Sequence, residues 1–189
     1  MAQKNNLLNT FIAIISFIAG YVLVKILFSQ NIELSYTGFL IAYVAMFLMM
    51  VLTLVVVLVA RSAPESRNTA GTLIYIFLII TFILSLLTKS LISILSVAMG
   101  LIIASIAHAI TKNNYLSSLF GAFSYGFLFF IFLIIAIILY LRNKNNIDKA
   151  ISKVELVLII QILLTIAILA ITFFVWLNNP FGIFSGKKL

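Results

Sequence analysis

Runs of about twenty apolar residues follow one another along the chain, and short polar breaks separate them. A helix needs about 20 mainly apolar residues to cross the hydrocarbon core of a bilayer. The chain is 65% hydrophobic and 8% charged, which is more apolar surface than a soluble domain of 189 residues can bury. The sequence therefore predicts an all-α, polytopic integral membrane bundle in the cell membrane, with a single transmembrane domain that covers residues 1–189.

Five polar breaks divide the chain into six predicted transmembrane helices. The long apolar tract Thr72–Ala109 is split in two, because one helix of that length would far exceed the hydrocarbon thickness. A turn at Thr88-Lys89-Ser90 also lets Lys89 reach the head groups, whereas a lysine in mid-membrane costs several kcal/mol. The six predicted helices are Leu7–Phe28, Phe39–Ala60, the two halves of Thr72–Ala109, Leu119–Leu141 and Leu156–Leu177.

Two similar segments suggest a 3+3 inverted repeat. Residues 13–20 read AIISFIAG and residues 93–100 read SILSVAMG, so both follow the pattern small-x-x-Ser-x-x-x-Gly. Inverted repeats of three helices are common in transporters. A chain so rich in Ile, Leu and Phe also produces chance matches readily, and the alignment outside these segments is poor. Chance resemblance is therefore the favoured explanation, and the repeat remains the alternative.

The positive charge is spread through short loops and both tails, although the formal net charge is +8. The sequence offers no basic face for nucleic acid, so contacts with membrane lipid head groups are the expected role of these residues. With six helices both termini lie on one side, and each side carries six basic residues. Lysine and arginine in short loops mark the cytoplasmic side. Lys25 lies within a helix end and counts for less in this comparison, so the side that holds the termini has the slight excess and is expected to be cytoplasmic.

The sequence excludes most kinds of chemical site. The chain has no cysteine and a single histidine, so neither a bound metal nor a haem cofactor is expected. Its carboxylates are Glu33, Glu65, Asp148 and Glu155, and all four are predicted to lie in loops or at a helix end. Embedded carboxylates usually mark proton relays, so proton pumping through this chain alone is not expected. No acid–base pair or nucleophile motif predicts an enzyme.

Two predicted helices carry stripes of small residues. Residues three and four apart lie on one face of a helix, and small side chains let two backbones approach closely in lipid, where dispersion must drive association. The stripes therefore predict helix-packing faces, and a reaction site would need more polar partners. The first helix carries Ala13, Ser16 and Gly20, and the fourth carries Ser93, Ser96, Gly100 and Ala104.

Three polar residues within the predicted helices are candidates for a polar site. His108 could act as a gate or as a ligand for a partner's site, but an interfacial histidine bonded to a carbonyl or head group is favoured. Gln161 and Thr165 share one face of the last helix and could line a path. An interhelical hydrogen bond is favoured for Gln161, since one polar stripe does not make a pore.

The sequence supports two functional hypotheses. The first is a non-catalytic accessory or structural subunit whose partners are other membrane protein subunits of a larger complex. The short loops, the packing faces and the lack of chemistry favour it. The alternative is a small-solute transporter or channel that uses the inverted repeat and the polar residues His108, Gln161 and Thr165.

Overall fold

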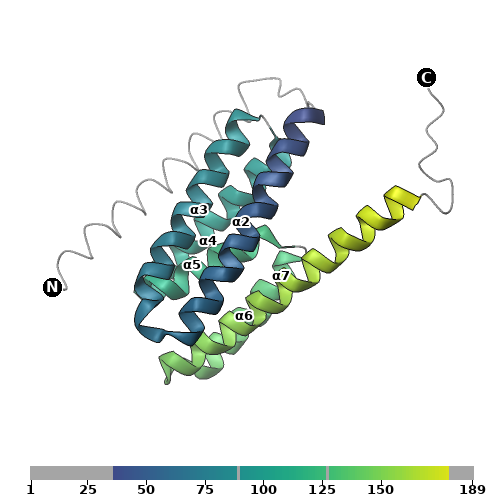
Figure 1. Cartoon of the computed structure of the whole chain (residues 1–189). Helices are drawn as coiled ribbons and strands as arrows, with labels where there is room; N and C mark the ends of the chain where they lie inside the picture. The colour runs from purple at the N-terminus through teal and green to yellow at the C-terminus, as the bar shows by residue number, and fades with distance from the viewer. Residues whose placement is uncertain (1–35, 89, 127, 179–189) are drawn as a thin grey trace, which may run out of the picture.

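The computed structural model describes residues 36–88, 90–126 and 128–178, and these ranges form helices with no strand (Figure 1). Two of the helices, η1 and η2, are short 3₁₀ helices and the others are α-helices. In chain order they are α2 (Tyr36–Ser62), η1 (Pro64–Ser66), α3 (Arg67–Leu87), α4 (Leu91–Thr111), α5 (Asn114–Ala122), η2 (Phe123–Tyr125), α6 (Phe129–Asn143) and α7 (Ile147–Asn178).

Four of these helices, α2, α3, α4 and α7, are long and apolar enough to cross a membrane. This agrees with the predicted all-α membrane fold, but the count of six transmembrane helices and the inverted repeat are not confirmed. The predicted division of the tract 72–109 is confirmed, because α3 ends at Leu87 and α4 begins at Leu91. The predicted helix Leu7–Phe28 and Lys89 lie outside the described residues.

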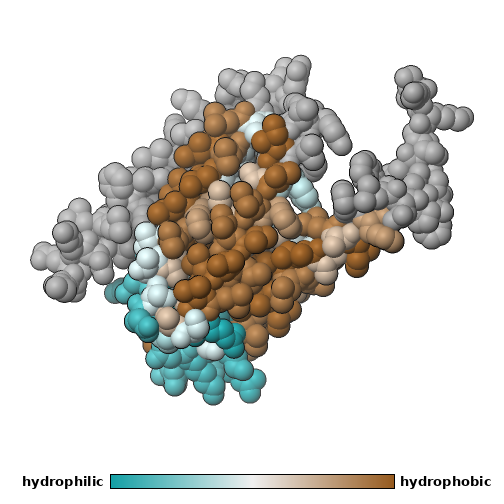
Figure 2. Space-filling view, in the orientation of Figure 1, coloured by the Kyte–Doolittle hydropathy of each residue, from teal (hydrophilic) through white to brown (hydrophobic). Residues whose placement is uncertain are grey.

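One end of the bundle, here named the basic end, collects the charged residues of the described ranges. Here α2, α4 and α6 end and α3, α5 and α7 begin. A salt bridge of 2.9 Å between Arg67 and Asp148 joins the starts of α3 and α7. Figure 2 shows hydrophilic residues gathered at this end and hydrophobic residues along the sides. The described basic residues are Arg61, Arg67, Lys112, Arg142, Lys144, Lys149 and Lys153.

The segment from α5 to α6 is a re-entrant hairpin, which corrects the prediction of one transmembrane helix at Leu119–Leu141. It leaves the basic end as α5, breaks after η2 and returns to the same end as α6. The Phe120 and Tyr140 rings meet edge to face at 6.1 Å across the hairpin. Lys112 and Arg142, which a helix crossing at 119–141 would place on opposite sides of the membrane, lie at the same end of the bundle. The even division of charge that was predicted from six crossing helices is therefore not supported.

The hairpin reaches deep into the bundle without crossing it. Its tip at η2 contacts Thr81, Ser96 and Gln161. Each of them lies 14 or 15 residues from the basic-end terminus of its own helix, a depth of about 21 Å at 1.5 Å per residue. The hydrocarbon core is about 30 Å thick. The short apolar helix α6 is therefore the returning arm of the hairpin, and it begins at about this depth.

The break in the hairpin has a local cause in the residues around Gly126. Gly126 is extended, with φ −94° and ψ 157°, and Leu128 adopts a left-handed conformation with φ 56°. Neither conformation continues a helix. An irregular backbone at membrane depth is tolerated only where protein buries it or where it lines a cavity. Here Gly126 is half-buried and Leu128 is 45% exposed, so the described helices cover the break only in part.

Candidate functional site

The helix α5 is the centre of the bundle, because every side chain from Tyr115 to Ala122 is buried. Its first turn is capped by Asn113, whose side chain accepts a hydrogen bond of 2.9 Å from the backbone N–H of Leu116. Helices α3, α4 and α7 all pack around it. A nine-residue helix would be marginal alone, so tertiary packing maintains α5 and aligns its polar side chains with those of its neighbours.

The predicted small-residue stripe of α4 lies against α5. We call α5 the half-helix, because it ends inside the bundle. A Cβ added at Gly100 would lie 2.8 Å from the carbonyl oxygen of Gly121, and one added at Gly121 would lie 2.8 Å from Ala104 Cβ. Ser96 Oγ donates a hydrogen bond of 2.7 Å to the carbonyl of Ser124. The two backbones therefore approach as closely as a glycine on each side permits.

The other stripe residues have different surroundings. Ser93 is buried near the opposite end of α4, where Ser90 Oγ donates to its hydroxyl at 3.1 Å. Leu101, which lies outside the stripe, does not face lipid in the described bundle, because its exposed fraction is only 2%. The stripe residues Ala13, Ser16 and Gly20 lie outside the described residues.

A buried carboxylate, Glu155, occupies the basic end of the bundle. The sequence placed it just before the last helix, but α7 begins at Ile147, so Glu155 lies inside that helix with an exposed fraction of 0%. Tyr115 donates its phenolic O–H to Glu155 Oε1 at 3.0 Å, and Arg67 Nε lies 3.6 Å from the same oxygen. The statement that no carboxylate is embedded is therefore wrong.

A polar cavity of about 240 Å³ lies beside the groups that contact this carboxylate. Arg67, Tyr115 and Asp148 contribute to its wall, and Asn68 and Asn113 add amide groups. Arg67 and Tyr115 contact Glu155 as well, so they separate the cavity from the buried carboxylate. Glu155 Oε2 has no hydrogen-bond partner within the described residues. One guanidinium thus faces two carboxylates, and the second oxygen of the buried carboxylate has no hydrogen-bond partner among the described residues.

A second polar group lies on α5 around Ser117, two residues further along the helix than Tyr115. Tyr75 of α3 donates its phenolic O–H to Ser117 Oγ at 2.9 Å. Ser117 Oγ in turn donates to the carbonyl of Asn113 at 2.8 Å, and His108 Nδ1 lies 3.5 Å from it. His108 therefore contacts the hydroxyl of the half-helix, and it is only partly buried.

The third polar group surrounds the hairpin tip. Gln161 Nε2 donates to the carbonyl of Phe123 at 2.9 Å, and the hydroxyls of Tyr125 and Thr81 share a hydrogen bond of 3.1 Å. Ser124 Oγ is buried at the same tip without a hydrogen-bond partner in the described chain. The tip therefore presents uncharged oxygen and amide groups in the middle of the bundle.

The structure does not bring the three sequence-predicted polar residues into one site. His108 belongs to the group around Ser117, whereas Gln161 contacts the hairpin tip. Thr165 Oγ1 donates to the carbonyl of Gln161 at 2.8 Å, a bond within its own helix. The bond from Gln161 to the carbonyl of Phe123 in η2 agrees with the predicted interhelical hydrogen bond. A role of Gln161 in function stays a prediction.

Sequence reasoning missed Glu155, Tyr115 and the polar groups of the half-helix. A usable signal was present in the segment LSSLFGAFSYG, residues 116–126, where serine and glycine interrupt the apolar run. Within the described residues, no three His, Cys, Asp or Glu side chains gather as a metal site would require. The chain matches no protein-family model, and no curated protein or solved structure shows significant similarity to it.

Proposed function

We propose that the protein is a small transporter or channel that moves a small monovalent cation, protons included, across the membrane. The observation that carries this proposal is Glu155, which lies fully buried beneath a polar cavity at the basic end. An ionisable residue within a transmembrane helix is costly, and it typically marks an ion or proton pathway. Arg67 and Tyr115 are its partners, and they would form the gate between the cavity and the carboxylate.

Polar groups along the bundle support a path that continues from Glu155. The group around Ser117 lies beside Tyr115 on α5, the hairpin tip lies deeper, and Ser85, Ser90 and Ser93 are buried toward the opposite end. Hydroxyl, carbonyl and carboxylate oxygens dominate these groups, and oxygen ligands suit hard cations. Transporters commonly place such groups where a discontinuous helix ends near the middle of the membrane. The α5–α6 hairpin provides such a discontinuity.

The accessory subunit of a larger membrane complex is the second candidate function. The observation that favours it is the mutual pairing of polar groups, as in Tyr75 with Ser117 and Ser96 with Ser124. Such bonds also hold purely structural bundles together, and each contributes about 0.6 kcal/mol in a membrane. On this hypothesis other membrane protein subunits would cover the exposed apolar faces, and the chain would carry no flux.

The membrane orientation follows from the re-entrant hairpin. All seven basic residues of the described ranges lie at the basic end. An excess of Lys and Arg in short loops marks the cytoplasmic side. We therefore propose that the protein lies in the cell membrane with its basic end toward the cytoplasm. The polar cavity above Glu155 would then be filled from the cytoplasm.

Flux through the purified full-length protein in sealed liposomes tests the transport proposal. A pH-sensitive dye reports protons, and cation-selective dyes report Na⁺ and K⁺. We expect uptake of at least one cation, and we expect Glu155→Gln to abolish it while thermal stability is retained. Glu65→Gln is the matched control, because Glu65 is exposed in η1. Absence of flux, together with a stable hetero-complex in gently extracted membranes, would favour the accessory subunit instead.

A further inference from the structure

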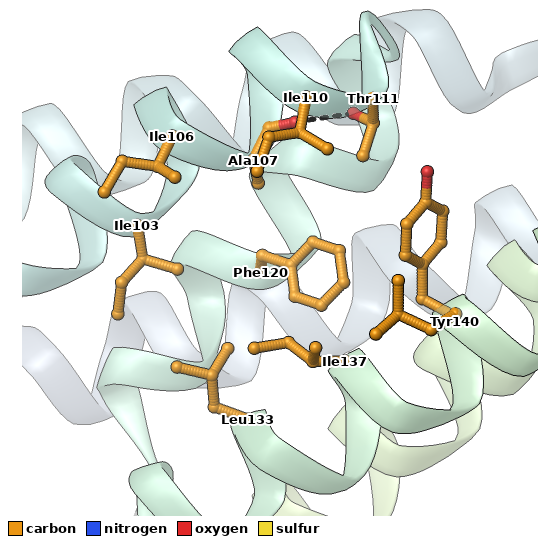
Figure 3. Close-up of a pocket in the computed structure, with 10 residues that line it drawn as sticks. Ile103, Ile106, Ala107, Ile110, Thr111, Phe120, Leu133, Ile137 and Tyr140 are labelled. Carbon is orange, nitrogen blue, oxygen red and sulfur yellow. Dashed lines mark hydrogen bonds between the residues drawn. The ribbon is translucent and has the colours of Figure 1, made fainter.

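A groove on the side of the bundle runs between α4 and α6, with Phe120 of α5 as its floor (Figure 3). It exists because α4 packs mainly on α5 and α3, whereas α6 packs mainly on α7. Ile103 and Ala107 line one wall, and Leu133 and Ile137 line the other. The volume is about 250 Å³. On α4 the lining extends from Ile103 to Thr111, a rise of eight residues, or about 12 Å of helix.

The lining changes in character toward the basic end of the groove. Thr111 and Tyr140 lie there, and the Tyr140 hydroxyl is directed toward that end (Figure 3). Tyrosines favour the level of the lipid head groups. The next residues along the two helices are Lys112 and Arg142, both exposed. Two exposed cations therefore follow directly on the residues that line the groove, at the end of the bundle where the charged residues gather.

We propose that the groove is a binding site for one anionic phospholipid, with an acyl chain against Phe120 and the phosphate between Lys112 and Arg142. Charge complementarity selects this occupant over the apolar segment of another protein, because such a segment would leave both cations at the mouth without a counter-ion. A zwitterionic phospholipid would gain less there, since its head group carries no net charge. This inference does not depend on the transport proposal.

Competition between two lipids tests the site. The full-length protein in mixed micelles with equal amounts of phosphatidylglycerol and phosphatidylcholine is analysed by native mass spectrometry. Near a surface each basic residue contributes about 1 kcal/mol to anionic lipid binding, so each adds about fivefold to the preference for phosphatidylglycerol. We expect the double variant Lys112→Gln/Arg142→Gln to lose most of that preference. Lys144→Gln, at an exposed residue beyond the groove lining, is the control and should retain it.

The groove itself needs separate variants. Ala107→Phe and Ile137→Trp fill it, and both should reduce the bound lipid of either kind, whereas Ile134→Trp on the exposed face of α6 should not. A photoreactive acyl chain on phosphatidylglycerol should label residues 103–111 and 133–141 of the wild-type protein, a measurement that requires no variant to fold. Equal retention of the two lipids by the wild type, or labelling confined to other segments, would overturn the proposal.

Discussion

Replacing Gly100 by alanine should destabilise the protein, because the crossing of α4 and α5 leaves no room for a methyl group. The added Cβ would lie 2.8 Å from the carbonyl oxygen of Gly121 and 2.8 Å from Ser124 Cβ. Real Cβ atoms contact such neighbours at 3.4–4 Å, so the helices would have to separate by more than half an ångström. The half-helix cannot yield easily, since α3 and α7 pack on its other sides.

The expected cost can be worked out from three contributions. Overpacking a close-packed interior costs about 1–3 kcal/mol. Separation of the helices would also weaken the hydrogen bond from Ser96 to Ser124, a loss of about 0.5–1.5 kcal/mol. Alanine is better than glycine in a helix by about 0.5–1 kcal/mol, which offsets the second contribution. The net loss is therefore about 1–3 kcal/mol, and Gly100→Leu should cost more.

Thermal unfolding of the purified protein measures this loss, since about 1 kcal/mol shifts the midpoint by about 2–4 °C for a chain of this size. Ala109→Leu adds bulk at an exposed position of the same helix and should change the free energy of unfolding by less than about 0.5 kcal/mol. Gly121→Ala should reproduce the loss, and the double variant should cost less than the sum, because both methyl groups separate the same two helices. A Gly100→Ala protein as stable as the wild type would refute the close crossing.

Three further results are expected. Leu101→Ala should lower the free energy of unfolding by about 2–5 kcal/mol, as for a buried leucine, and a change below about 0.5 kcal/mol would mean that Leu101 faces lipid. Arg67→Ala should lower the free energy of unfolding by about 3 kcal/mol, because it leaves the Glu155 carboxylate buried without its cation. The double variant with Glu155→Gln should regain most of that loss. If it regains none, the Arg67–Glu155 contact does not contribute to stability. Single cysteines at 112 and 144 should react with an impermeant reagent from the same side of sealed vesicles, and reaction from opposite sides would contradict the re-entrant hairpin.

The sequence by itself determined the class of fold and the positions of most helices. In a membrane each backbone polar group must be hydrogen-bonded within the helix, so an apolar run long enough to cross forms a helix. The length of apolar runs therefore predicts membrane helices. The division of the tract 72–109, the loop at Pro64 and the small-residue face of α4 follow from local patterns alone. The starts of α3 and α7 were less accurate, because the polar first turns of both helices resemble loops in composition.

Only the tertiary structure decided what those helices do at the centre of the bundle. The run 119–141 is apolar except for Gly121, Ser124 and Gly126 near its start. A helix that crosses tolerates such residues too, so composition alone does not distinguish it from a hairpin that returns. The close approach at Gly100 and Gly121 buries α5, and this burial allows the serines of α5 to lie inside the bundle. Glu155 was classed with the loops because burial depends on neighbours distant in sequence, here Arg67 and Tyr115. Contacts of that kind are set by packing, and no single-residue pattern encodes them.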